Sequence, residues 1–169
     1  MKRLSILLCA IILVFGLVSC GKNETKSVFD GYSLGMSRDE IANKLGKPTS
    51  TFDALQQYSD TYDGVSYFGL SGFLRFFYSD KDNPVLTGIC WGTSGLDNIK
   101  ALSEKETEIN KIIALYDSLY GEHKSYISNE YDDSETTVYE WKDLYMNTIT
   151  LELVQYPELG HIVLEITRE

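Results

Sequence analysis

Residues 148–156 read TITLELVQY. Apolar side chains alternate with polar ones at a period of two, which is typical of a β-strand that buries one face. Residues 161–167, HIVLEIT, keep the same alternation, and residues 157–160, Pro-Glu-Leu-Gly, are typical of the turn between two strands. We therefore expect this part of the chain to form two half-buried antiparallel strands.

Shorter apolar runs indicate four more strands upstream. We expect them at residues 64–70, 72–78, 84–91 and 138–142, with a polar turn at residues 79–83. The strand at 72–78 is apolar on both faces, whereas a strand that faces water on one side alternates cleanly. One of its faces is therefore expected either to pack against the rest of the chain or to bind a partner.

Two helices are predicted, each from a capping box. In Ser37-Arg38-Asp39-Glu40 the first and last side chains can bond to each other's backbone amides, and Gly46 followed by Pro48 ends the helix. Ser103-Glu104-Lys105-Glu106 repeats the box, and apolar residues follow at helical spacing up to Gly121.

The order of these elements predicts an α+β fold in which a helix is followed by antiparallel strands, in two tandem copies. The glycines that end the two helices, Gly46 and Gly121, are 75 residues apart, and a group of strands follows each. This pattern places the first helix-plus-sheet unit at residues 28–98 and the second at residues 99–169. The alternative is a single α+β domain whose two helices pack on one continuous antiparallel sheet.

The first predicted helix carries a resemblance to a known family. The segment Gly35-Met36-Ser37-Arg38-Asp39-Glu40-Ile41, closed by Leu45-Gly46-Lys47-Pro48, resembles the small envelope lipoproteins of the SmpA/OmlA (BamE-like) type and the repeats of the β-lactamase inhibitor protein. The resemblance implies a module that binds other proteins through its sheet and loops and that has no catalytic residues. A second helix-and-sheet half departs from the BamE-like pattern.

The N-terminus resembles that of a bacterial lipoprotein. A basic start and an apolar stretch end in Leu17-Val18-Ser19-Cys20, which is similar to a lipobox. We expect residues 1–19 to be a signal peptide that is removed, Cys20 to carry the lipid, and residues 20–27 to be a tether. An uncleaved anchor is the alternative. Gly21 follows the cysteine, which favours the outer membrane if the organism has one, and otherwise the outer face of the cytoplasmic membrane.

The net charge of the chain is −10, and loss of Lys2 and Arg3 with the signal would make it −12. Such an acidic chain is not expected to bind nucleic acid through charge. Cys90 would be the remaining free thiol, and its apolar neighbours indicate a small buried residue rather than a reactive one. The partners expected are the membrane, through Cys20, and a protein of the envelope.

The residue patterns typical of enzymes and metal sites are missing. His123 and His161 have no second ligand at zinc spacing. Neither Gly69-Leu70-Ser71-Gly72 nor Gly92-Thr93-Ser94-Gly95 has the spacing of a serine hydrolase. Acidic clusters near Asp80 and at residues 130–135 leave calcium open, and a pair of carboxylates for glycoside cleavage also stays open. We expect no cofactor, no metal and no enzymatic activity.

Aromatic residues are the best candidates for binding. Phe73 and Phe77 flank Arg75 on one face of a predicted strand, and Tyr126 and Tyr131 lie in a second, tyrosine-rich segment. These five residues are the predicted partner-binding site. The function expected is that of a lipid-anchored, non-enzymatic protein-binding module of the cell envelope, with a lipoprotein that binds a small molecule or a glycan as the alternative and an envelope hydrolase as a third.

Overall fold

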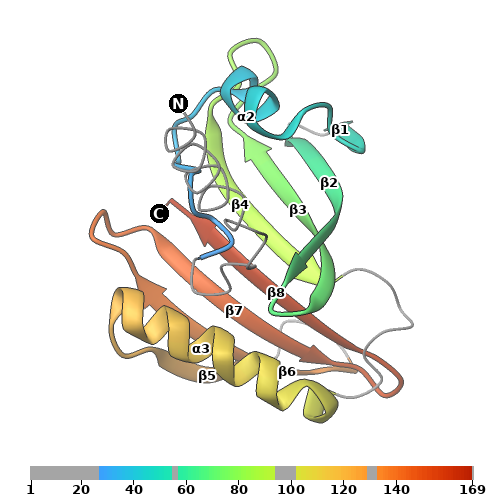
Figure 1. The fold of residues 1–169 in the computed structure, drawn as a ribbon, viewed down its shortest axis with the longest axis vertical. Coiled ribbons are helices and arrows are strands. Elements are labelled where there is room, and N and C mark those ends of the chain that lie inside the picture. Colours follow the sequence, from blue (N-terminus) through green and yellow to red (C-terminus); the bar gives the residue numbers. More distant parts are fainter. Residues whose placement is uncertain (1–26, 55–56, 94–101, 129–132, 169) are drawn as a thin grey trace, which may run out of the picture.

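The computed structural model describes residues 27–54, 57–93, 102–128 and 133–168. The described residues form one eight-stranded antiparallel sheet with two helices and the N-terminal segment in front of it (Figure 1). The two α-helices are α2 (Arg38–Leu45) and α3 (Glu106–Tyr120), and a 3₁₀ helix, η1 (Leu102–Lys105), directly precedes α3. The strands are β1 (Ser50–Ala54), β2 (Gln57–Tyr67), β3 (Leu70–Tyr78), β4 (Leu86–Thr93), β5 (Lys124–Ser128), β6 (Glu135–Lys142), β7 (Thr148–Gln155) and β8 (Gly160–Thr167).

Several predictions concern residues outside the described ranges. The predicted signal peptide, the lipid-bearing Cys20, most of the tether and the boundary between residues 98 and 99 are among them. Within the described ranges, no helix is both long enough and apolar enough to cross a membrane.

The predicted α+β fold of two tandem helix-then-strand units is wrong. The strands lie in the order β1-β2-β3-β4-β8-β7-β6-β5, so β8, from the second predicted unit, pairs directly with β4, from the first. The result is a mostly β architecture built on one continuous sheet, to which two short helices are added. Period-two alternation identifies strands, but it does not say which strand pairs with which.

One face of the sheet, here called the inner face, carries the core. Alternate residues of every central strand point to it, and they include Leu74 and Phe76 of β3, Trp91 of β4 and Leu164 of β8, all at most 3% exposed. Helix α2 adds Ile41 to this core, and α3 adds three residues, namely Ile109, Ile112 and Tyr116. The sheet supplies most of the core, and the helices cover part of it.

Helix α2 begins as its sequence predicts, and it is fastened to the sheet. The capping box of Ser37 and Glu40 is present. The next residue after the cap, Arg38, donates hydrogen bonds from Nε and Nη2 to the two carboxylate oxygens of Asp60 in β2, at 2.7 and 2.8 Å. Asp60 is 1% exposed, and it also accepts a bond from Thr51 of β1 at 2.7 Å. One buried carboxylate thus ties the start of the helix to two strands.

Two local predictions differ from the structure. The second capping box does not form, because residues 102–105 make a 3₁₀ turn and α3 begins at Glu106 with no side-chain bond at its cap, Lys105. The strand predicted at 64–70 belongs to a longer hairpin: β2 runs through residue 67, and Phe68 and Gly69, with φ of +48° and +80°, form its two-residue turn. The end strands β1 and β5 were not predicted, since their residues are almost all exposed and do not alternate.

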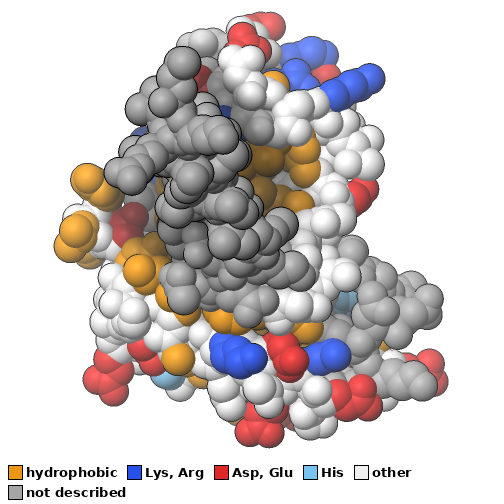
Figure 2. Space-filling view, viewed as in Figure 1, with side chains coloured by type: hydrophobic (Ala, Val, Ile, Leu, Met, Phe, Trp, Pro, Cys, Tyr) orange, Lys and Arg blue, Asp and Glu red, His pale blue; other side chains and the backbone are white. Residues whose placement is uncertain are grey.

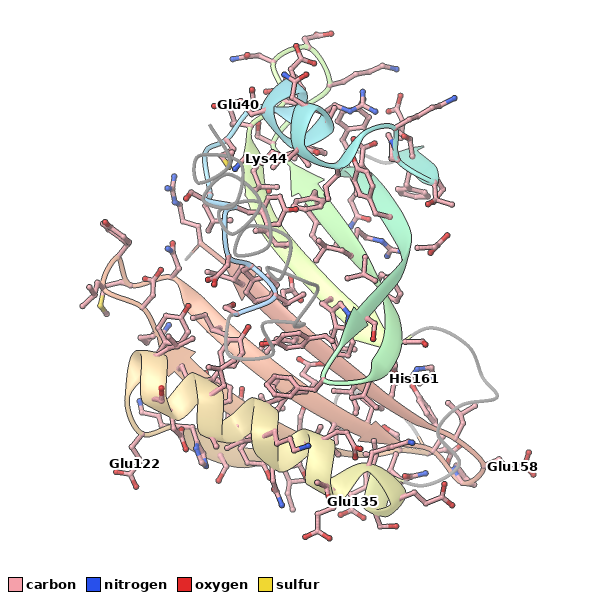
Figure 3. The ribbon with its side chains drawn as sticks, in the orientation of Figure 1. Glu40, Lys44, Glu122, Glu135, Glu158 and His161 are labelled. Atoms are coloured by element: carbon pink, nitrogen blue, oxygen red, sulfur yellow. The ribbon has the colours of Figure 1, made fainter. Side chains whose placement is uncertain are left out.

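Residues 148–156 and 161–167 do form the expected antiparallel pair. The strands β7 and β8 pair over their full length, from Thr148 opposite Thr167 to Gln155 opposite Gly160. The turn between them carries Glu158, at the end of the sheet opposite to Glu122 (Figure 3). Clear alternation and a turn with proline and glycine were sufficient to predict this pairing, because the partner strand is the next one along the chain.

We expect Gly72→Ala to destabilise the fold by about 2–3 kcal/mol, because an added Cβ would lie 2.3 Å from the backbone oxygen of Gly92 and 2.9 Å from Trp91 Nε1. The matched control is Gly88→Ala, whose nearest contact would be an ordinary 3.4 Å, and which should change the stability by less than about 1 kcal/mol. Urea unfolding of both variants measures the difference. Equal stabilities would contradict the close approach of β3 and β4.

Arg38→Ala should cost about 3 kcal/mol, since it leaves the carboxylate of Asp60 buried without its cation. Lys81→Ala is the control, because it breaks an ion pair with Asp53 whose side chains are 68% and 46% exposed. That pair is expected to contribute less than about 1 kcal/mol. Thermal unfolding monitored by circular dichroism compares the stabilities of the two variants. A similar small loss of stability in both would show that the buried carboxylate of Asp60 does not need the charge of Arg38.

Candidate functional site

The face of the sheet opposite to the core, here called the outer face, carries the candidate site. The described helices pack against the inner face, so polar side chains can collect on the outer one. The strand pairings place seven residues in one row across this face, one from each strand from β2 to β5 in sheet order. They are Thr61, Arg75, Cys90, Glu165, Thr150, Glu140 and Lys124.

Arg75 is the cation at the centre of the predicted site. Its Nε donates a hydrogen bond to Thr61 Oγ1 at 3.0 Å, and its guanidinium carbon lies 5.2 Å from the centroid of the Phe73 ring. These contacts hold the plane of the guanidinium against the sheet. Arg75 makes no ion pair with a carboxylate of the described residues. Its charge is therefore positioned by neutral neighbours and can accept an anionic group from outside.

Phe73 and Phe77 are half-buried because each contacts a glycine of the next strand. The ring of Phe73 lies over Gly92, where a Cβ would come within 2.9 Å of it, and Phe77 lies beside Gly88. An aromatic ring over a cross-strand glycine covers backbone that would otherwise face water. Phe73 therefore has a packing role, whereas Phe77 also borders open space.

A groove of about 380 Å³ lies beside Arg75 and Phe77, between β1, β2 and β3. Its wall is mixed: two aromatic rings, one guanidinium, one amide and several hydroxyl groups. The lining residues are Ser50, Thr51, Phe52, Gln57, Ser59, Thr61, Arg75 and Phe77. Phe52 is 52% exposed on the end strand β1. The groove thus offers an apolar surface, hydrogen-bonding groups and a positive charge within one small area.

In the middle of the row, the environment of Cys90 and Glu165 disfavours the charged forms of both side chains. Burial raises the pKa of the Cys90 thiol to about 12, and the nearby carboxylate of Glu165 acts in the same direction. Burial also raises the pKa of Glu165, and the neighbouring Glu152 of β7 adds to this effect by charge repulsion. Cys90 is buried, as its apolar sequence neighbours predicted, and its raised pKa disfavours the thiolate form that reacts.

The structure separates the two halves of the predicted site. Phe73, Arg75 and Phe77 lie together on β3, but Tyr126 lies on the end strand β5, where it is 49% exposed. Five strand spacings separate β3 from β5, or about 24 Å along the sheet. Tyr126 shares the outer face with the other three, because its pairing with Val138 places it in the row that contains Phe73. Tyr131 lies outside the described residues.

The other candidate residues have local structural partners. His123 Nδ1 lies 2.9 Å from the carboxylate of Asp117, which also accepts a bond from Trp141 at 2.9 Å. Burial acts to raise the pKa of Asp117, but the hydrogen bonds from His123 and Trp141 outweigh it and lower that pKa. Asp80 accepts a bond from the amide of Asn83 and so stabilises its own turn. Among the described residues, no group of three potential ligands could hold a metal ion.

Two exposed features of the structure were not predicted from the sequence. The groove depends on β1, whose residues 50–54 lack the alternation that marks a strand. The second feature is the turn between β6 and β7, where Leu144, Tyr145 and Met146 are highly exposed. Three adjacent large apolar residues between an aspartate and an asparagine were a signal that could have been found in the sequence.

We expect Glu165→Gln to raise the melting temperature by a few degrees at pH 7. A carboxyl group whose pKa is raised by folding adds stability at low pH, and this contribution is lost as the pH rises through its folded pKa. The gain of the variant should therefore disappear near pH 4. Melting curves between pH 4 and 8 test this, with the exposed Glu135→Gln as control. A gain that does not depend on pH would contradict the electrostatic explanation.

The chain matches no family model, and no curated protein or solved structure is significantly similar to it. The resemblance of residues 35–48 to the SmpA/OmlA module therefore stays a prediction that rests on those residues. Function has to be inferred from the geometry of the outer face, and above all from Arg75 and its groove.

Proposed function

We propose that this chain is a lipid-anchored protein of the cell envelope that binds another protein, without catalysis, through the outer face of its sheet. Attachment through Cys20 follows from its lipobox-like sequence. The binding face is the area around Arg75, Phe77 and the adjacent groove. The partner expected there carries a carboxylate beside an apolar or aromatic side chain.

The observation that carries the proposal is that Arg75 is held in position without an ion pair to any described carboxylate. In a chain of net charge −10, this guanidinium is held by a hydroxyl and an aromatic ring and has no carboxylate of its own among the described residues. A guanidinium that is positioned in advance loses little conformational freedom on binding and can form a bidentate bond with a carboxylate. Arginine and aromatic residues are also the types enriched at the energetic centres of protein interfaces.

The end strand β1 supports the same proposal. Its five residues are all exposed, and one of its edges is unpaired in the described sheet. An extended segment of a partner can add to such an edge by backbone hydrogen bonds, which would bring its side chains to the adjacent groove. Recognition by strand addition and by Arg75 would thus use neighbouring parts of the same surface.

A small carboxylated molecule or an acidic glycan is the second candidate. Hydroxyl groups at Ser50, Ser59 and Thr61, together with the rings of Phe52 and Phe77, favour it, because ligand sites commonly combine such polar and apolar groups. The groove, at about 380 Å³, is large enough for a small ligand. The two candidates differ in whether a protein partner remains bound through purification.

We expect Arg75→Ala to reduce recovery of a co-purifying partner by about tenfold, as loss of a central arginine commonly does. The lipidated protein is purified from its own membranes in mild detergent and its partner is quantified by mass spectrometry. Lys111→Ala, which removes an exposed charge from α3 on the other side of the sheet, should leave recovery unchanged. Both variants should keep the melting temperature of the parent.

Two outcomes would contradict the proposal. Equal recovery of the partner with the Arg75 and Lys111 variants would show that the binding site is not on the outer face. A single species without a partner, combined with a thermal shift on addition of an acidic glycan that is lost in Arg75→Ala, would favour ligand binding instead. Cys20→Ala serves as the control for attachment, since it should release the protein from the membrane.

A further inference from the structure

The turn between β6 and β7 exposes three consecutive large apolar side chains. Leu144 is 98% exposed, Tyr145 86% and Met146 63%, and we call these residues the apolar tip. The turn projects from the left edge of the sheet in Figure 1, and Figure 2 shows hydrophobic side chains standing out along that edge. Single exposed apolar residues are common on proteins, but a contiguous group at the end of a projecting hairpin indicates a contact.

The backbone of the turn is held in place by Asp143. One carboxylate oxygen of Asp143 accepts hydrogen bonds from the amides of Tyr145 and Asn147, at 2.8 and 2.9 Å, and the other accepts from the side chain of Asn147 at 2.7 Å. The amide of Met146 donates to the Asp143 carbonyl at 3.1 Å, and Met146 has φ of +63°. The amides of Tyr145 and Met146 therefore already have partners, which lowers the cost of moving this part of the backbone out of water.

The apolar tip lies on the same side of the molecule as the start of the described chain. Ser27 lines a pocket of about 500 Å³ together with Asp143 and Tyr145. The position of Ser27 is fixed, because its hydroxyl group bonds to that of Tyr116 in α3 at 2.7 Å. Residues 20–27 can span at most about 25 Å. A lipid on Cys20 would therefore hold the membrane surface within reach of the tip.

We infer that the apolar tip inserts into the membrane surface and fixes the orientation of the protein on the bilayer. This inference rests on the proposed lipid attachment at Cys20. Leucine, methionine and tyrosine suit the boundary between headgroups and acyl chains, where a tyrosine ring can keep its hydroxyl group hydrated. The partner is an uncharged lipid surface, since the tip has no charge of its own and a chain of net charge −10 is repelled by anionic headgroups. With the tip inserted, the sheet and its outer face would take one orientation above the bilayer.

The test uses tryptophan as a reporter in the lipidated full-length protein, reconstituted into phosphatidylcholine vesicles. Tyr145→Trp places the reporter in the apolar tip, and Tyr126→Trp is the matched control on the exposed strand β5. The two native tryptophans, Trp91 and Trp141, are at most 2% exposed and contribute equally to both variants. We expect blue-shifted emission from the reporter at position 145, and loss of most of that emission when brominated lipids are present. The control should show neither effect.

Three other results would overturn all or part of the inference. If the Tyr145→Trp variant floats with the vesicles but its reporter is not quenched, insertion is wrong and lipid attachment stands. If the protein does not float with the vesicles, both the insertion of the tip and the lipid attachment at Cys20 are wrong. A blue shift without quenching, seen only when envelope proteins are added, would assign the tip to a protein partner. Partner binding at Arg75 is measured separately, so that a failure of insertion and a failure of the proposed function are distinguishable.

Discussion

The pairing of β4 with β8 is the constraint on which the rest of the structure depends. Ile89 lies opposite Ile166 and Trp91 opposite Leu164, so that the two halves of the chain share one sheet and one core. Neither helix could cover a separate sheet, because α2 buries one residue and α3 buries three. The same pairing aligns the outer face, since it brings Cys90 beside Glu165 and joins the two halves of the polar row.

The fold was partly predictable because two different kinds of information define it. Local patterns located the hairpin at 148–167 and the start of α2 at Ser37, and both match the structure. The alignment of β4 with β8 has no local pattern, since their residues lie some 75 positions apart in the chain. The second capping box had the right residues but failed, because a 3₁₀ turn takes up residues 102–105. Tertiary packing can outweigh a short motif whose contribution is about 1 kcal/mol.

In the candidate site, too, the local arrangement could be predicted from the sequence, whereas the long-range arrangement could not. Alternation along β3 placed Phe73, Arg75 and Phe77 on one face without any knowledge of the neighbouring strands. The structure adds what those residues contact: a glycine of the next strand lies beside each phenylalanine, and a threonine of β2 accepts from the arginine. Tyr126 was grouped with them by composition, yet it lies at the far side of the sheet. Residue type alone identifies candidates for binding, and only strand order decides which of them can act together.

The burial of Cys90 has a consequence for its reactivity toward oxidants and other thiols. Burial raises the pKa of the thiol to about 12, so the thiolate is strongly disfavoured at neutral pH. The thiolate is the form that oxidants and foreign disulfides attack. A reactive cysteine at a protein surface tends to link chains together wherever the surroundings are oxidising. Because Cys90 is buried between Arg75 of β3 and Glu165 of β8, its sulfur is shielded from such cross-linking, although no second cysteine lies among the described residues to form a disulfide with it.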